Sequence, residues 1–115
     1  MTMAAKQVVL DRAQVEERST ERVQEGPGVH RALLWVEGGS TAGLMWVEPD
    51  ARMDEHVHHG HAHHVWVIEG TPKVLGRELQ AGSYAFVPPG VPHSLEGGPE
   101  GCQLFYLYLA VDDVS

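Results

Sequence analysis

Histidine is concentrated in one short part of this 115-residue sequence. Neutral imidazole binds divalent transition metals well, at about 2.0–2.2 Å, so histidines crowded into a protein interior are readily explained by a cation that holds them together. The cluster therefore predicts a metal site, and a solvated loop that binds metal adventitiously is the simpler alternative. Six of the eight histidines lie within one stretch: His56, His58, His59, His61, His63 and His64.

The spacing within the cluster indicates which imidazoles converge. In a β-strand, residues i and i+2 face the same side, so His56 and His58 can point together into an interior. His63 directly precedes the apolar run VWVI and is placed to supply a third imidazole from the next strand. A register shifted by one residue would instead combine His59 and His61 with His63, and this alternative stays open.

Short apolar runs rich in β-forming residues follow and precede the cluster. Glycine- and proline-rich turns separate them, which predicts an all-β, antiparallel sandwich or barrel. The polar segment 11–25 predicts a surface turn of helix or an irregular arm. We expect one domain, with an N-terminal arm and edge strand in residues 1–28 and a β-barrel in residues 29–111. The runs cover residues 29–36, 41–48, 64–70, 83–87 and 103–111.

Charge and composition argue against several classes of function. Eight Lys and Arg against sixteen Asp and Glu give a net charge of −8, which disfavours nucleic acid as a partner. No apolar run approaches the length of a membrane span, and the first residues lack the apolar stretch of an export signal. Cys102 is the single cysteine and cannot form an intramolecular disulfide. We therefore expect a cytoplasmic protein without a membrane partner.

Two segments resemble the motifs of the cupin superfamily. Residues 50–70 read D-x5-H-V-H-x4-H-x6-G, which is similar to the first cupin motif, G-x5-H-x-H-x(3,4)-E-x6-G. Residues 82–93 read G-x5-P-x-G-x2-H and match the second motif at every defining position up to the histidine. The resemblance implies a small single-domain cupin, folded as an antiparallel double-sheet jelly-roll barrel.

The resemblance also implies which residues bind the metal. His56, His58 and His63 of the first motif and His93 of the second correspond to the family's ligand positions. Asp50 replaces the first glycine, which an Asp in a left-handed turn can do. His63 replaces the usual glutamate, so the ligand set becomes formally neutral and the ion becomes a stronger Lewis acid. Imidazole ligands suit iron, manganese, nickel, copper and zinc alike, so the metal stays undetermined.

A divalent cation that is bound only by neutral imidazoles keeps its full charge. It therefore favours anionic oxygen ligands such as enolates and phenolates. Similar all-histidine cupins include dioxygenases of diketones and hydroxylated aromatic ketones and cyclases of aromatic polyketide pathways. The run HVHHGHAHH particularly resembles the pattern of dihydroxyacetophenone-type dioxygenases. The resemblance therefore implies a dioxygenase-like oxidoreductase in which the metal is the reactive centre. A cyclase or isomerase is the nearest alternative, and a non-enzymatic sensor or metal-binding cupin is another.

The other polar candidates have simpler interpretations. His59, His61 and His64 are expected to face solvent or to orient a ligand through a hydrogen bond, and His30 and Cys102 are expected to be structural. Small cupins often pair through an edge strand, so a homodimer is expected, with KQVVL near the N-terminus as a candidate strand. Three glutamates are possible acids or bases but are more simply solvated: Glu48, Glu55 and Glu69. Some aromatic residues should line a pocket: Trp35, Trp46, Trp66, Phe86, Tyr106 and Tyr108 are candidates.

Overall fold

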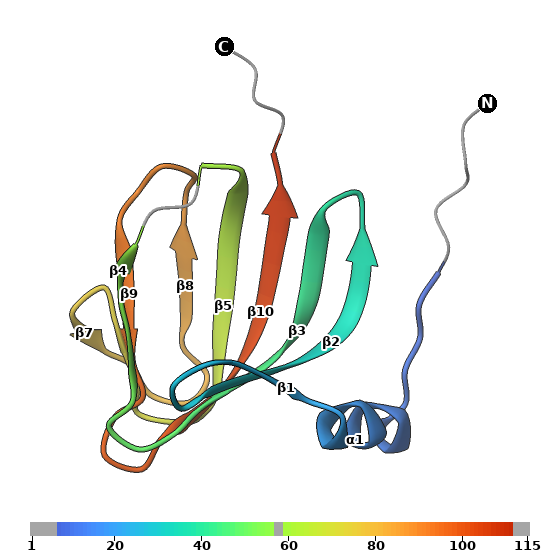
Figure 1. Cartoon of the computed structure of the whole chain (residues 1–115), viewed down its shortest axis with the longest axis horizontal. Coiled ribbons are helices and arrows are strands. Elements are labelled where there is room, and N and C mark those ends of the chain that lie inside the picture. Colours follow the sequence, from blue (N-terminus) through green and yellow to red (C-terminus); the bar gives the residue numbers. More distant parts are fainter. Residues whose placement is uncertain (1–6, 57–58, 112–115) are drawn as a thin grey trace.

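Two antiparallel sheets face one another and form the body of the molecule (Figure 1). The computed structural model describes residues 7–56 and 59–111, and for residues 54–56 it describes only the backbone. Within these ranges the strand order is β1-β2-β3-β10-β5-β8 in the larger sheet and β4-β9-β6-β7 in the smaller one. The all-β, antiparallel class predicted from the apolar runs is thereby confirmed.

The larger sheet contains all five predicted apolar runs. The runs form strands because their β-branched and aromatic residues pack well on a pleated surface, and in β10 they alternate between a buried and a more exposed face. The strands are β1 (Val23–Gly26), β2 (Val29–Glu37), β3 (Ser40–Val47), β5 (His61–Gly70), β8 (Tyr84–Val87) and β10 (Cys102–Ala110).

The smaller sheet is built from short strands that the sequence analysis did not delimit. Strands of two to five residues with mixed polar composition carry too little alternation to be recognised from periodicity. They are β4 (Arg52–His56), β6 (Lys73–Val74), β7 (Arg77–Glu78) and β9 (His93–Glu96). Strand β4 pairs with β9, and His56 lies opposite His93 in this register.

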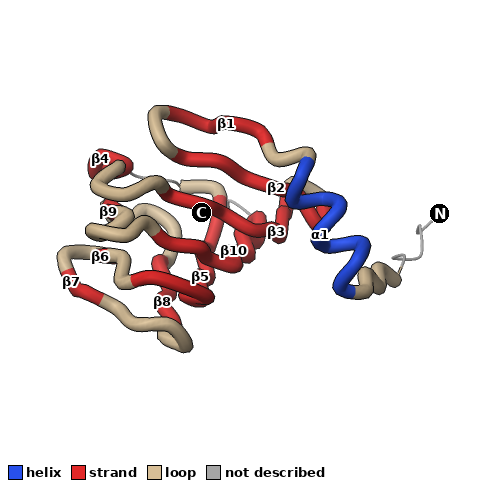
Figure 2. Tube along the Cα trace, turned by 90° about the horizontal axis from the view of Figure 1, so that it is seen from below, coloured by secondary structure: helices blue, strands red, loops and turns tan. Residues whose placement is uncertain are grey.

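The N-terminal region contains a helix, which is one of the two structures expected for the polar segment 11–25. Helix α1 (Arg12–Thr20) begins with a capping box, in which Asp11 Oδ1 accepts a hydrogen bond from the Gln14 backbone and Gln14 Oε1 accepts one from the Asp11 backbone. Figure 2 shows α1 beside the edge of the larger sheet rather than between the sheets. The edge strand next to β2 is β1, whereas residues 7–10 lie outside every strand.

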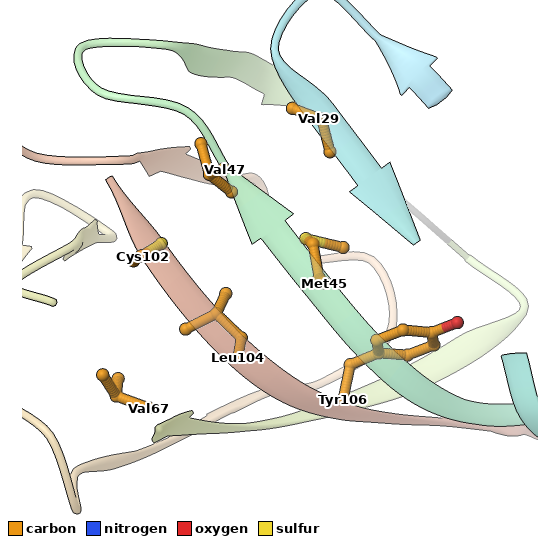
Figure 3. Packing of buried hydrophobic residues seen from close by; sticks show 7 residues of the cluster. All are labelled: Val29, Met45, Val47, Val67, Cys102, Leu104 and Tyr106. Carbon is orange, nitrogen blue, oxygen red and sulfur yellow. The ribbon is translucent and has the colours of Figure 1, made fainter. Parts of the chain in front are cut away.

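The core lies on the inner face of the larger sheet (Figure 3). In β10, alternation buries Cys102, Leu104 and Tyr106 and leaves the residues between them partly exposed. Burial raises the pKa of the Cys102 thiol from 9.0 to about 11, so this cysteine stays protonated at neutral pH. This environment supports the structural role expected for Cys102. The remaining members of the cluster are Val29, Met45, Val47 and Val67.

Two turn positions of the first motif have left-handed backbone conformations. Gly70 has a φ of +89°, and an added Cβ would lie 2.9 Å from Cys102 Cα, so no side chain fits there. Asp50, which replaces a glycine of the motif, has a φ of +60°. This is the left-handed conformation that an aspartate in a turn was expected to tolerate.

Candidate metal centre

His63 and His93 come from different sheets and meet between them. His63 lies in β5 of the larger sheet, and His93 is the first residue of β9 in the smaller sheet. Their ring centroids are 5.1 Å apart, and the ring planes make an angle of 71°. The fold thus brings one histidine of each cupin motif to the same point.

This spacing fits two ligands of one metal ion. With a metal–nitrogen bond of about 2.1 Å, two imidazoles bound at roughly 90–110° to each other would have centroids about 4.6–5.3 Å apart. The observed distance of 5.1 Å lies in that range. Two neutral imidazoles are also the donors that divalent transition metals prefer.

A backbone hydrogen bond selects the tautomer of His93. Its Nδ1 lies 3.1 Å from the carbonyl oxygen of Val91. A carbonyl oxygen can only accept, so Nδ1 carries the proton and Nε2 carries the lone pair. Histidines that bind metals usually donate their second N–H to a carbonyl or carboxylate in this way. His93 is therefore in the tautomer that binds a metal through Nε2.

His63 is fixed by an aromatic neighbour. Only 6% of its surface is exposed, and its ring stacks on Tyr108 with centroids 3.8 Å apart and an interplanar angle of 18°. Tyr106 contacts Tyr108 in turn, at 4.6 Å between centroids. Burial raises the pKa of Tyr108 to about 12, so its hydroxyl stays neutral.

A small, mainly apolar cavity adjoins the two histidines. Its volume is about 40 Å³, and both sheets contribute to its walls. About 10–15 Å³ of such space is enough for one water molecule, so the cavity has room for a water-sized group beside the histidines. Among the described residues, the apolar walls include Met45, Met53, Val65, Val87, Leu95 and Leu104.

Three other histidines of the cluster lie away from the contact between His63 and His93. His61 shares the inner face with His63, but its Nε2 donates to the Gly39 carbonyl at 2.9 Å, and its ring is 6.3 Å from that of His63. His64 lies on the opposite face, where its Nδ1 is 2.6 Å from the hydroxyl of Tyr84. His59 is exposed.

Of the two remaining predicted ligands, the structure describes one by its backbone alone and does not describe the other. His58 lies outside the described residues, and the backbone of His56 is described only as the register partner of His93. Within residues 7–56 and 59–111, no group of three or more His, Cys, Asp or Glu side chains is placed to hold a metal ion. The described side chains thus supply His63 and His93, and the roles of His56 and His58 stay predictions.

Two of the three glutamates considered as acids or bases, Glu48 and Glu69, do not adjoin this cavity. Glu48 and Glu69 line a separate hollow of about 330 Å³ next to Trp46 and Cys102. The side chain of Glu55 lies outside the description. Of the six aromatic residues considered for the pocket wall, Tyr106 and Tyr108 line this cavity. The contact of Tyr108 with His63 depends on β10 lying beside β5 and could not be read from the sequence.

Facing antiparallel sheets with motif histidines from both sheets define the cupin architecture. The chain belongs to the ChrR cupin-like domain family, which matches residues 7–112. Its resemblance to the cupins is therefore confirmed, as is the jelly-roll fold. No match was found among curated proteins.

Several solved structures share this fold. An RmlC-like cupin from Shewanella frigidimarina is 28% identical, with a TM-score of 0.71, over 80% of this chain and 85% of that chain. KdgF from Halomonas sp. is 20% identical, with a TM-score of 0.71, over 80% and 87%. A chain in the complex of Rhodobacter sphaeroides SigE with the anti-sigma ChrR is 21% identical, with a TM-score of 0.65, over 75% and 48%.

In the part of the chain that the structure describes, no helix has the length and apolar character needed to cross a membrane.

Proposed function

We propose that this chain is a metal-dependent cupin enzyme, of the dioxygenase-like oxidoreductase type, acting on an enolisable or phenolic small molecule. The observation that supports it is the contact of His63 and His93, with centroids 5.1 Å apart, at a mainly apolar cavity. A purely structural metal site would be closed by its ligands, whereas a cavity beside the ligands leaves room for a reacting group.

The histidines would hold the ion, and the other side chains would shape its surroundings. His63 and His93, with His56 and His58, would be the ligands of iron, manganese, nickel, copper or zinc. A divalent ion held there supplies Lewis acidity toward an anionic oxygen of the substrate. The apolar walls would exclude bulk water, which strengthens electrostatic attraction at that point.

Oxygen uptake tests this function. The untagged protein would be reconstituted anaerobically with iron(II) and mixed with a panel of diketones and hydroxyaryl ketones. Stoichiometric oxygen uptake with at least one substrate is expected, and the His93→Ala protein should show none. Metal-bound protein that consumes no oxygen with any member of the panel would contradict the dioxygenase assignment.

Two alternatives give different outcomes in the same experiment. A cyclase or isomerase would use the same Lewis acidity and convert a substrate without consuming oxygen. A sensor or metal-binding cupin would bind the metal and convert nothing. The second alternative has support from the family itself, since one structural neighbour is a complex between a sigma factor and the anti-sigma ChrR.

We also propose that two copies of the chain associate. The outer face of β5 and β8 exposes a group of apolar side chains: Trp66, Tyr84, Phe86 and Ile68. The rings of Trp66 and Tyr84 contact each other, and the ring of Phe86 contacts His64 beside them. Exposed aromatic clusters of this kind are typical of protein interfaces. A chain with a net charge of −8 repels its copies least at an apolar face such as this one.

Light scattering after size-exclusion chromatography should give a mass near twice 12.6 kDa. Phe86→Glu should shift the mass toward a single chain, because it places a charge in the exposed ring cluster. Leu75→Glu is the matched control, since Leu75 is similarly exposed, 47% against 46% for Phe86, but lies in the turn between β6 and β7. A wild-type mass near 12.6 kDa would overturn this proposal.

A further inference from the structure

We infer that Tyr108 is a positioning residue that fixes the ring plane of His63 for metal binding. This inference rests on the proposed metal site. It concerns a residue of β10 in the larger sheet, whereas His93 lies in the smaller sheet, and it assigns no direct contact between Tyr108 and the ion.

The stack between Tyr108 and His63 is the closest ring contact of any described histidine. Tyr108 lies directly opposite His63 in the register between β10 and β5. The two centroids are 3.8 Å apart and the planes are nearly parallel, at 18°. The next closest such contact, between His64 and Phe86 on the outer face, has centroids 4.8 Å apart and a 40° angle.

Tyr108 is itself held by further contacts. Its ring meets that of Tyr106, which is only 1% exposed, at 4.6 Å between centroids. The guanidinium of Arg31 lies over the Tyr106 ring, with its Cζ 5.4 Å from the ring centroid. Glu25 of the edge strand pairs with Arg31 at 2.8 Å. A chain of contacts therefore supports Tyr108 from β1 through β2 to β10.

The flat ring of Tyr108 covers one face of the His63 ring and thereby limits rotation of the imidazole out of its plane. An aliphatic side chain of similar size would restrict this rotation less. A ligand whose plane is fixed in advance loses less freedom when the ion binds. Neighbours that orient a metal ligand typically change metal affinity by 10–100-fold when they are removed.

Cobalt(II) binding to the full chain tests the inference. Affinity would be measured by competition with a chelator, and the visible absorption of bound cobalt(II) would report the coordination geometry. Tyr108→Leu should bind cobalt(II) about tenfold more weakly, with an altered spectrum. Tyr108→Phe keeps the ring and should restore both the affinity and the spectrum. Tyr84→Leu is the matched control, because it removes a tyrosine beside His64 on the outer face and should change neither.

The outcomes separate this inference from the metal site itself. Failure of the wild-type chain to bind cobalt(II) would overturn the proposed site. Normal binding by Tyr108→Leu, or an equal loss in Tyr108→Phe, would overturn only the role of the ring. Should Tyr108→Leu fail to fold, proton NMR of the metal-free wild type decides. The His63 ring protons are expected upfield of those of His59, and unshifted protons would contradict the stack.

Discussion

Replacing His93 with alanine is expected to lower the affinity of the chain for divalent metal by more than about 100-fold. Removing a residue that hydrogen-bonds to a metal ligand lowers metal affinity by about 10–100-fold, and removing the ligand itself lowers the affinity further. His93 is held by Val91 in the tautomer that presents Nε2, so the substitution removes a donor atom that is already available to the ion. Isothermal titration with zinc or iron(II) under anaerobic conditions would measure the change.

Substitutions within the histidine-rich segment 56–64 test whether the loss of metal is specific to the proposed ligands. His63→Ala and His58→Ala should lose stoichiometric metal as His93→Ala does. His59→Ala and His64→Ala should retain it, because His59 is exposed and His64 lies on the outer face beside Tyr84. Equal losses in all five proteins would mean that the cluster binds metal as an unstructured group and that the proposed ligand set is wrong.

The second large effect is expected from Gly43→Ala, which should destabilise the fold by about 3 kcal/mol or more. Gly43 lies in β3 opposite Tyr106 of β10. A Cβ at this position would lie 2.6 Å from Tyr106 Oη and would also collide with the backbone oxygen of Ala32. Tyr106 is almost fully buried and cannot move aside. Thermal unfolding should show a decrease of about 10 °C in Tm.

Gly26→Ala provides the matched control for that substitution. Gly26 also lies in a strand of the larger sheet, and an added Cβ would meet no described atom within 4 Å. Its unfolding free energy should stay within about 0.5 kcal/mol of the wild type. Equal stability of Gly43→Ala and Gly26→Ala would contradict the close packing of Tyr106 against β3. It would also contradict the contact through which Tyr106 holds Tyr108.

Five strands of the larger sheet, β2, β3, β5, β8 and β10, could be predicted from sequence because each coincides with a run of β-forming residues between turn residues. Runs such as 103–111 contain several β-forming residues in succession and end at glycine or charged residues. The smaller sheet could not, because β6 and β7 contain two residues each and have no periodicity of their own. They are strands because β9 supplies a partner for β6, which is a tertiary effect.

The sequence identified His63 and His93, which the structure brings together, but it did not predict the geometry of their contact. Parity along the strand separates His63, which is buried, from His64, which lies on the outer face. The contact of His63 with His93 requires two sheets to face one another, and the stack on Tyr108 requires β10 beside β5. Neither arrangement follows from spacing within one strand.

A crystal structure of the metal-reconstituted protein, with anomalous diffraction at the metal's absorption edge, tests the central claim most directly. One anomalous peak per chain is expected within about 2.0–2.2 Å of Nε2 of His93 and of a ring nitrogen of His63, with His56 and His58 completing the ligand set. An empty space between these rings in the presence of excess metal, or a peak bound elsewhere on the chain, would contradict it.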